Sequence, residues 1–236
     1  MSTVPGTARP RSRLRLVIFD CDGVLIDSEA LCNSVVAAEL TAAGWSMTVS
    51  DSHRLFLGLT FPDTQAAAEA HLGRSLGPDW ADRLVARVTA VMAAEATLIP
   101  GARAALEATS ALGLPWRIAS NSSHAEMAAK FARVGIADLV VGRIHSSEDM
   151  IALGKRGKPA PDLFLAAAEQ EGVNPAGCLV IEDSVAGVQA AVAAGMDCLG
   201  FCPDDDGNTL RAAGAVPFHA MAALPGLLQA AMESRR

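Results

Sequence analysis

Two aspartates stand close together directly after a short apolar run near the start of the chain. Residues 16–19 are apolar at every position, which is typical of a strand that is buried on both faces of a parallel sheet. Asp20 follows the run, Asp22 comes two residues later, and Gly23 permits a sharp turn. Because open α/β sheets bind ligands at the carboxyl ends of their strands, the spacing predicts a pair of functional carboxylates there.

Two other interpretations of this segment are weaker. Asp and Gly are also common in solvated turns, so the pattern DxDG does not by itself decide between a turn and a functional site. A calcium-binding EF-hand loop needs a third acidic residue where Val24 stands and a helix before the loop, and the sequence predicts neither. The interpretation therefore depends on matching segments farther along the chain.

One such segment follows a second predicted strand, at 116–119. Ser120 and Asn121 come directly after this strand, and Ser123 opens the next helix with the spacing of a capping box. A hydroxyl beside a helix N-terminus is suited to binding an anion. Helix capping explains Ser122 and Ser123 but leaves Ser120 unexplained.

Two further segments contribute a lysine and an acidic pair. Lys158 lies in the proline-rich motif GKPAPD and is one of only three lysines in the chain. Glu182 and Asp183 follow a third apolar strand, at 178–181, and precede a helix that Ser184 opens. Adjacent carboxylates repel each other unless a cation joins them, so this pair indicates a metal site.

Taken in this order, the motifs DxDGVLxDS, Ser120, KPAPD and EDSxAG resemble the haloacid dehalogenase superfamily. The resemblance is specific to its phosphatase and β-phosphoglucomutase-like branch, and it covers the chain from Leu14 onward. It implies an α/β fold in which a doubly wound, Rossmann-like parallel sheet carries an inserted all-helical cap domain.

The resemblance also implies a role for each group. Asp20 would attack phosphorus to form an aspartyl phosphate, and Asp22 would protonate the leaving oxygen and then deprotonate water. Ser120 and Lys158 would assist catalysis by holding the transferring phosphoryl group. The implied phosphate-binding residues are Ser120, Asn121 and Lys158. The implied Mg²⁺ ligands are Asp20, the backbone carbonyl of Asp22, Glu182 and Asp183.

The predicted elements divide the chain into a tail, a core and a cap. Residues 1–13 are rich in Arg, Pro and Gly and are expected to form a flexible N-terminal tail. Residues 14–27 and 98–236 alternate strands and helices and are expected to form the core, whereas 28–97 show helical periodicity only and are expected to form the cap. Hinges are expected near 27–29 and 98–101. The predicted strands are 16–19, 116–119, 138–141, 178–181 and 197–201. The predicted helices are 28–44, 51–56, 63–72, 78–97, 102–112, 123–134, 161–171 and 185–194.

Composition excludes several classes of protein. The 236 residues are 51% hydrophobic and 19% charged, which is enough apolar surface for a buried core. A net charge of −7 argues against nucleic acid as a partner, and prolines interrupt the uncharged stretch 212–232, so no membrane span is expected. Five cysteines without a CxxC pair fit reduced thiols in the cytoplasm. We expect a monomer or weak dimer whose partner is a small phosphorylated substrate.

Hydrolysis of a small phosphate monoester, on a sugar, polyol or sugar acid, is the favoured function. The alternatives are a β-phosphoglucomutase-like mutase and a catalytically silent sugar-phosphate-binding protein. Mutases of this branch carry a basic residue in the cap loop and a histidine on the first cap helix, where this chain has Phe61 and Cys32. Haloacid dehalogenation is disfavoured because it uses neither the second aspartate nor a metal, and phosphonate cleavage because no cap lysine precedes Lys130. The candidate substrate contacts of the cap are Arg54, Arg74, Arg83 and Arg87.

Overall fold

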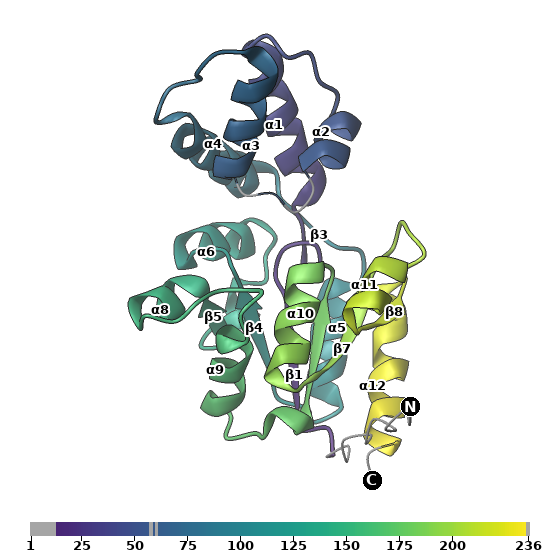
Figure 1. Cartoon of the computed structure of the whole chain (residues 1–236). Coiled ribbons are helices and arrows are strands. Elements are labelled where there is room, and N and C mark those ends of the chain that lie inside the picture. The colour runs from purple at the N-terminus through teal and green to yellow at the C-terminus, as the bar shows by residue number, and fades with distance from the viewer. Residues whose placement is uncertain (1–12, 57–58, 60, 235–236) are drawn as a thin grey trace, which may run out of the picture.

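A six-stranded parallel sheet carries the four polar segments. The computed structural model describes residues 13–56, 59 and 61–234, and its strands follow the order β5-β4-β1-β6-β7-β8 (Figure 1). The chain moves outward from β1 first toward one edge and then toward the other, which is the doubly wound order, and the predicted α/β fold class is confirmed. The strands are β1 (Leu16–Phe19), β4 (Trp116–Ser120), β5 (Ile144–Ser146), β6 (Cys178–Glu182), β7 (Asp197–Phe201) and β8 (Val216–Phe218).

Strand β1 is apolar throughout because helices cover both faces of the sheet. Val17 and Phe19 belong to an apolar cluster with α5, α6 and α12, whereas Leu16 and Ile18 belong to one with α9, α10 and α11. All four side chains are fully buried, and each contributes roughly 1.5–3 kcal/mol relative to exposure. The core helices are α5 (Ala102–Ala111), α6 (His124–Arg133), α7 (Ala137–Val140), α8 (Ser147–Ala152), α9 (Asp162–Gln170), α10 (Val185–Ala194), α11 (Asn208–Ala213) and α12 (Leu224–Glu233).

The edge strand β5 begins later in the chain than predicted. The prediction of a strand at 138–141 is wrong, because Ala137–Val140 form the short helix α7 and strand β5 begins at Ile144. Val140 is buried while Val141 is 76% exposed, so this apolar run does not present two covered faces as a strand inside the sheet would. Gly142, with φ of 70°, then turns the chain toward its parallel pairing with β4. A short apolar run does not distinguish strand from helix.

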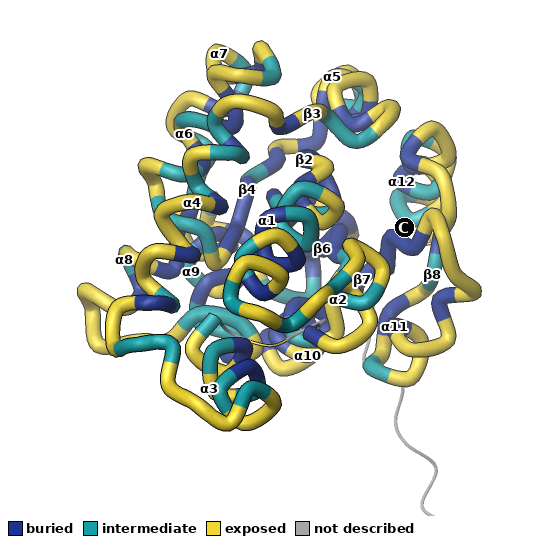
Figure 2. Tube along the Cα trace, turned by 90° about the horizontal axis from the view of Figure 1, so that it is seen from above, coloured by how far each residue is buried: buried dark blue, intermediate teal, exposed yellow. Residues whose placement is uncertain are grey.

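Four helices form the inserted segment above the sheet (Figure 1). They have an apolar cluster of their own, built around Leu40, Phe56, Leu84 and Met92, which is separate from the two clusters of the sheet. Seen from above, these helices lie over the core, with α4 beside α6 (Figure 2). They are α1 (Glu29–Ala42), α2 (Val49–Phe56), α3 (Phe61–Leu72) and α4 (Trp80–Glu95), close to the predicted bounds.

The chain enters and leaves this helical segment through a two-stranded ribbon. Strand β2 (Ile26–Asp27) pairs antiparallel with β3 (Thr97–Leu98), in the register Ile26 to Leu98 and Asp27 to Thr97. The ribbon lies at the predicted hinges. Its position is consistent with the division into core and cap, which stays a prediction. Residues 1–12 of the predicted tail lie outside the described residues. Within the described part of the chain, no helix is both long and apolar enough to cross a membrane.

Candidate active site

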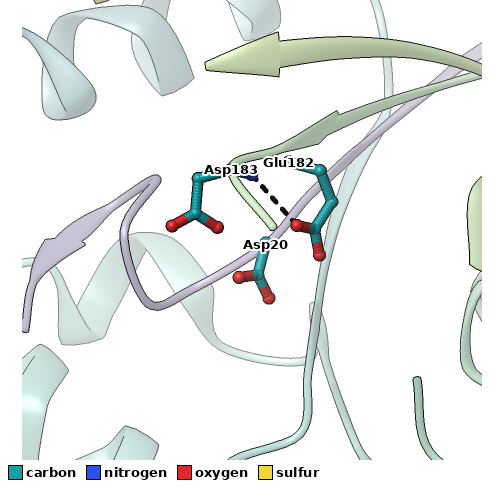
Figure 3. Close-up of side chains that lie close together, drawn as sticks. All are labelled: Asp20, Glu182 and Asp183. Atoms are coloured by element: carbon teal, nitrogen blue, oxygen red, sulfur yellow. Dashed lines mark hydrogen bonds between the residues drawn. The ribbon is translucent and has the colours of Figure 1, made fainter. Parts of the chain in front are cut away.

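Three carboxylates meet where the strand order reverses. The backbone N–H of Asp20 donates to the carbonyl of Ile181 over 2.9 Å, which extends the pairing of β1 and β6 to the end of the sheet. Asp20, Glu182 and Asp183 therefore leave neighbouring strand ends and converge (Figure 3). Each offers a carboxylate oxygen, and these oxygens lie within 4.8 Å of one another.

Lys158 is the cation that joins two of these carboxylates. Its Nζ lies 2.5 Å from Asp20 Oδ1 and 2.6 Å from Glu182 Oε1, and its side chain is 4% exposed. Burial alone would lower the pKa of the Lys158 ammonium, but Asp20 and Glu182 raise it above its ordinary value. The ammonium is therefore held charged between two groups that would otherwise repel each other.

The loop that carries Lys158 is held by Asn121. The backbone N–H of Lys158 donates to Asn121 Oδ1 over 2.9 Å, and Asn121 Nδ2 donates to the Lys158 carbonyl over 3.2 Å. A Cβ at Gly157 would lie 2.5 Å from Asn121 Oδ1, so this approach requires glycine. The Asn121 amide thus orients the lysine loop, and its predicted contact with phosphate stays a prediction.

Glu182 is fixed by the two residues that precede α10 as well as by Lys158. Its Oε2 accepts hydrogen bonds from the backbone N–H groups of Asp183 and Ser184 and from Ser184 Oγ, at 2.9–3.0 Å. The residue is fully buried, and a Cβ at Gly187 would lie 1.8 Å from Glu182 Oε1. Both carboxylate oxygens therefore have protein partners, and Glu182 is held in one orientation.

The remaining oxygens form a set that suits Mg²⁺. Among the described residues, no hydrogen bond reaches Oδ2 of Asp20, and Asp183 Oδ2 packs so closely on Gly23 that a Cβ there would lie 1.8 Å away. Burial raises the pKa of Asp20 to about 7 despite the opposing effect of Lys158, and burial followed by Glu182 raises that of Asp183. A divalent cation would relieve this crowding, and carboxylate oxygens are the ligands that Mg²⁺ prefers.

Asp22 has a separate set of partners. Ser122 Oγ donates to Asp22 Oδ2 over 2.7 Å, and Lys130 Nζ donates to Asp22 Oδ1 over 2.7 Å and lies 3.2 Å from Ser122 Oγ. Lys130 is not among the site residues predicted from the sequence, and Ser122 is predicted only as part of a helix cap. Ser123 is the residue that caps α6, in a capping box with Glu126. The helical spacing of residues 127, 130 and 131 places Lys130 on the same face of α6 as the buried Met127 and Phe131. A lysine on a buried helix face needs a charged partner, and this pattern can be seen in the sequence.

A cavity of about 320 Å³ opens onto these groups. Ser120 is buried at the end of β4, and its Oγ accepts the backbone N–H of Ser122 over 3.0 Å. All of the lining residues belong to the core; they are Asp20, Asp22, Ser120, Asn121, Ser122, Glu126, Lys158, Glu182, Ser184 and Ala186. The structure thus brings Asp22, Ser120 and Asn121 to the same cavity as Asp20, Lys158 and Glu182.

Three of the four candidate arginines of the cap have other contacts in this conformation. Arg54 pairs with Asp51, Arg87 pairs with Glu39, and Arg74 donates to the backbone carbonyl of Ala43. Within the described part of the chain, none of the four candidate arginines lines the cavity. Their predicted contact with substrate therefore stays a prediction.

Comparisons with known proteins find both sequences and structures that are similar to this chain. The sequence model of the haloacid dehalogenase-like hydrolases matches residues 14–195. The 6-phosphogluconate phosphatase of Escherichia coli (strain K12) is 28% identical over 93% of this chain and 96% of its own length, and hexitol phosphatase A of the same organism is 31% identical over 78% and 81%. The crystal structure of a haloacid dehalogenase-like protein of unknown function from Agrobacterium tumefaciens is 34% identical and superimposes with a TM-score of 0.83, covering 92% of this chain and 98% of that one.

The packing of Gly187 against Glu182 predicts that Gly187→Ala lowers stability. The Glu182 carboxylate has no room to move because four donated hydrogen bonds and burial hold it, so the added methyl should reduce the free energy of unfolding by roughly 1–3 kcal/mol. Urea unfolding measures the change. Gly226→Ala is the matched control, since it lies in α12 with nothing within 4 Å of its added Cβ, and it should be neutral or slightly stabilising. Equal effects of the two substitutions would contradict this account of Gly187.

The raised pKa of Asp20 predicts a pH-dependent stabilisation by Mg²⁺. The pKa of Asp20 is 3.8 in the unfolded chain, its ordinary value, and about 7 in the folded protein without metal. At a pH between these two values, the folded protein retains a proton on Asp20 that the unfolded chain releases. This group's contribution to stability therefore falls as the pH rises through that window. Because Mg²⁺ must displace that proton, it should raise the melting temperature more at about pH 8 than at about pH 5. Asp20→Asn should reduce the difference between the two pH values, and an equal Mg²⁺ effect at both in the wild type would contradict the assignment.

Proposed function

This chain belongs to the haloacid dehalogenase-like hydrolases, and we propose that within this family it is a Mg²⁺-dependent phosphatase of a small phosphorylated sugar, polyol or sugar acid. The named phosphatases among its relatives make it a phosphoric monoester hydrolase. The observation that carries the mechanistic proposal is the Lys158 ammonium, which bridges Asp20 and Glu182 in the lining of the cavity, with Asp183 beside them. It offsets charge on a carboxylate that must approach a phosphate anion.

The proposed reaction has two steps at Asp20. An oxygen of the Asp20 carboxylate attacks phosphorus, the bond from phosphorus to the ester oxygen breaks, and protonated Asp22 gives its proton to that leaving oxygen. Asp22, now a carboxylate, takes a proton from a water molecule whose oxygen attacks the aspartyl phosphate. The bond between Asp20 and phosphorus breaks, inorganic phosphate forms, and both aspartates return to their starting states.

The other cavity groups support charge and position. Lys158 and Ser120 are proposed to bind the phosphoryl oxygens, and Lys158 stands ready because Asn121 holds its backbone. Asp20, Asp183, Glu182 and the backbone carbonyl of Asp22 would hold Mg²⁺. When bound, Mg²⁺ supplies positive charge to the phosphoryl oxygens. Because both Glu182 oxygens have protein partners, Asp20 and Asp183 are proposed as the main carboxylate ligands.

The substrate class rests on the relatives and on the cap. One relative is named for a phosphorylated sugar acid and the other for a phosphorylated hexitol, which supports a small polyhydroxylated substrate. Among the described residues, those that line the cavity of about 320 Å³ come from the core, so we propose that the helices of residues 28–97 complete it by closing on the β2–β3 ribbon. Five cysteines without a disulfide in the described chain fit the proposed cytoplasmic location.

Asp20→Asn is expected to abolish turnover. The amide keeps the shape of the side chain but removes the nucleophile, so hydrolysis across a panel of phosphate monoesters with Mg²⁺ should fall to background. Brief incubation of the wild type with a good substrate, followed by acid quench and mass spectrometry, should find one phosphoryl group on the peptide that contains Asp20. Asp204→Asn, in an exposed loop, is the control and should keep full activity. Near-normal turnover by Asp20→Asn would contradict the mechanism, and an inactive wild type would favour a binding protein.

Product analysis separates hydrolysis from phosphoryl transfer to a second sugar. In the structure Phe61 packs against the apolar cluster of the cap and Cys32 does the same, so neither of these positions supplies a charge that would hold a second phosphate. With β-glucose 1-phosphate and catalytic glucose 1,6-bisphosphate, we therefore expect mostly inorganic phosphate. Phosphate and glucose 6-phosphate are measured separately. Mostly glucose 6-phosphate would replace the phosphatase proposal by the mutase.

A further inference from the structure

We propose that Lys130 is a positioning residue for the reaction, which fixes the Asp22 carboxylate so that one oxygen is directed to the leaving group of the substrate. The inference rests on the proposed function, because it gives Lys130 a role through the acid–base group of that mechanism. It is carried by a contact that the mechanism above does not use. Lys130 donates to Asp22 across 108 positions of sequence.

Lys130 approaches Asp22 from the interior of the protein. Its side chain is 7% exposed, whereas that of Asp22 is 31% exposed, so the ammonium lies deeper than the carboxylate that it binds. Asp22 and Ser122 line the cavity, and Lys130 is absent from the lining among the described residues. Lys130 therefore cannot contact a substrate in this cavity except through Asp22 or Ser122.

The two oxygens of Asp22 consequently have different surroundings. Oδ1 accepts from the buried ammonium of Lys130, while Oδ2 accepts from Ser122 Oγ, a hydroxyl of the cavity wall, and both distances are 2.7 Å. The Ser122 hydroxyl shows that Oδ2 can bond to a hydroxyl oxygen on the cavity side. When the ester oxygen of a substrate leaves and takes up a proton, it becomes an alcohol hydroxyl, which is chemically similar to the hydroxyl of Ser122. Oδ2 is thus the oxygen that would exchange a proton with the leaving group.

The neighbours of Lys130 are themselves fixed. Ser122 is held at its backbone by two contacts, since its carbonyl accepts from Ser146 Oγ over 2.7 Å and its N–H donates to Ser120 Oγ over 3.0 Å. Lys130 lies inside the helix α6, whose N-terminus is closed by the Ser123 capping box. Without Lys130, nothing among the described residues holds Oδ1, so the carboxylate could rotate and would spend less time aligned with the ester oxygen.

The leaving group of the substrate provides the test. A sugar or polyol phosphate releases an alkoxide that needs a proton, whereas p-nitrophenyl phosphate releases a stable phenolate that does not. Lys130→Met should therefore lower kcat/KM for the best alkyl phosphate of the panel by about 10- to 100-fold, within the roughly 10²- to 10⁴-fold share of acid–base catalysis. For p-nitrophenyl phosphate the loss should stay below about threefold. Lys130→Arg keeps the charge and the donors and should restore most of the alkyl-phosphate activity.

A double-mutant cycle identifies Asp22 as the group through which Lys130 acts. In the Asp22→Asn background, Lys130→Met should change kcat/KM for the alkyl phosphate by less than about twofold, because the group that it positions is already lost. Lys155→Met is the matched control, since Lys155 is an exposed lysine outside the cavity lining. If Lys130→Met does not fold, as judged by its melting curve, Ser122→Ala replaces it and should show the same dependence on leaving group.

Each outcome decides the inference. Equal losses on both esters, or losses that multiply those of Asp22→Asn, would make Lys130 a structural residue only and overturn the proposal. A raised KM with unchanged kcat would make Lys130 a substrate contact and overturn it as well. If the wild type hydrolyses neither ester with Mg²⁺, the proposed function fails, whereas wild-type hydrolysis without the leaving-group effect overturns the role of Lys130 alone.

Discussion

The bridge from the Lys158 ammonium to Asp20 and Glu182 is the interaction on which the rest of the site depends. Carboxylates at adjacent strand ends repel each other in a buried place, and one ammonium at 2.5 and 2.6 Å makes their approach possible. Other features maintain this bridge: Asn121 binds the backbone of Lys158, and the backbone N–H groups of Asp183 and Ser184, just before α10, bind Glu182. Removing one partner of such a buried pair typically reduces stability by about 3–5 kcal/mol, since it leaves an uncompensated charge.

The charges around the cavity divide into two groups, each with one lysine. Lys158 joins Asp20 and Glu182, with Asp183 beside them, whereas Asp22 is paired with Lys130. Burial first and the neighbouring Glu182 second raise the pKa of Asp20, and the excess of carboxylates over ammonium groups in the first group suits the binding of a divalent cation. The second group pairs the Asp22 carboxylate with one ammonium, apart from the proposed cation ligands Asp20 and Asp183. Separate environments for two neighbouring aspartates are what a nucleophile and an acid–base group require.

The site residues and the helices of the cap lie on separate parts of the chain, so the site can stay rigid while the cap moves. Asp20, Ser120 and Glu182 all belong to or directly follow strands of one sheet, and both faces of that sheet are covered by helices. Side chains on such rigid elements hold their geometry better than those on loops. The helices above have their own apolar cluster and are joined to the core by the β2–β3 ribbon, with a contact from Thr89 Oγ1 to Glu126 Oε1 over 3.1 Å. Substrate selection is thus proposed to depend on the cap.

Local patterns in the sequence determined the strand that precedes Asp20, the strand that ends in Glu182, and the Ser123 capping box, because burial periodicity and helix capping depend on residues a few positions apart. They did not determine β5, since a short apolar run fits either a helix or a strand until its neighbours are known. Only the tertiary structure shows that Lys130 contacts Asp22. It also shows that Ser122, predicted as part of a helix cap, donates a hydrogen bond to Asp22. The physical reason is distance along the chain: a side chain's role in a site is decided by the charges that packing brings to it, and those come from segments about a hundred residues away.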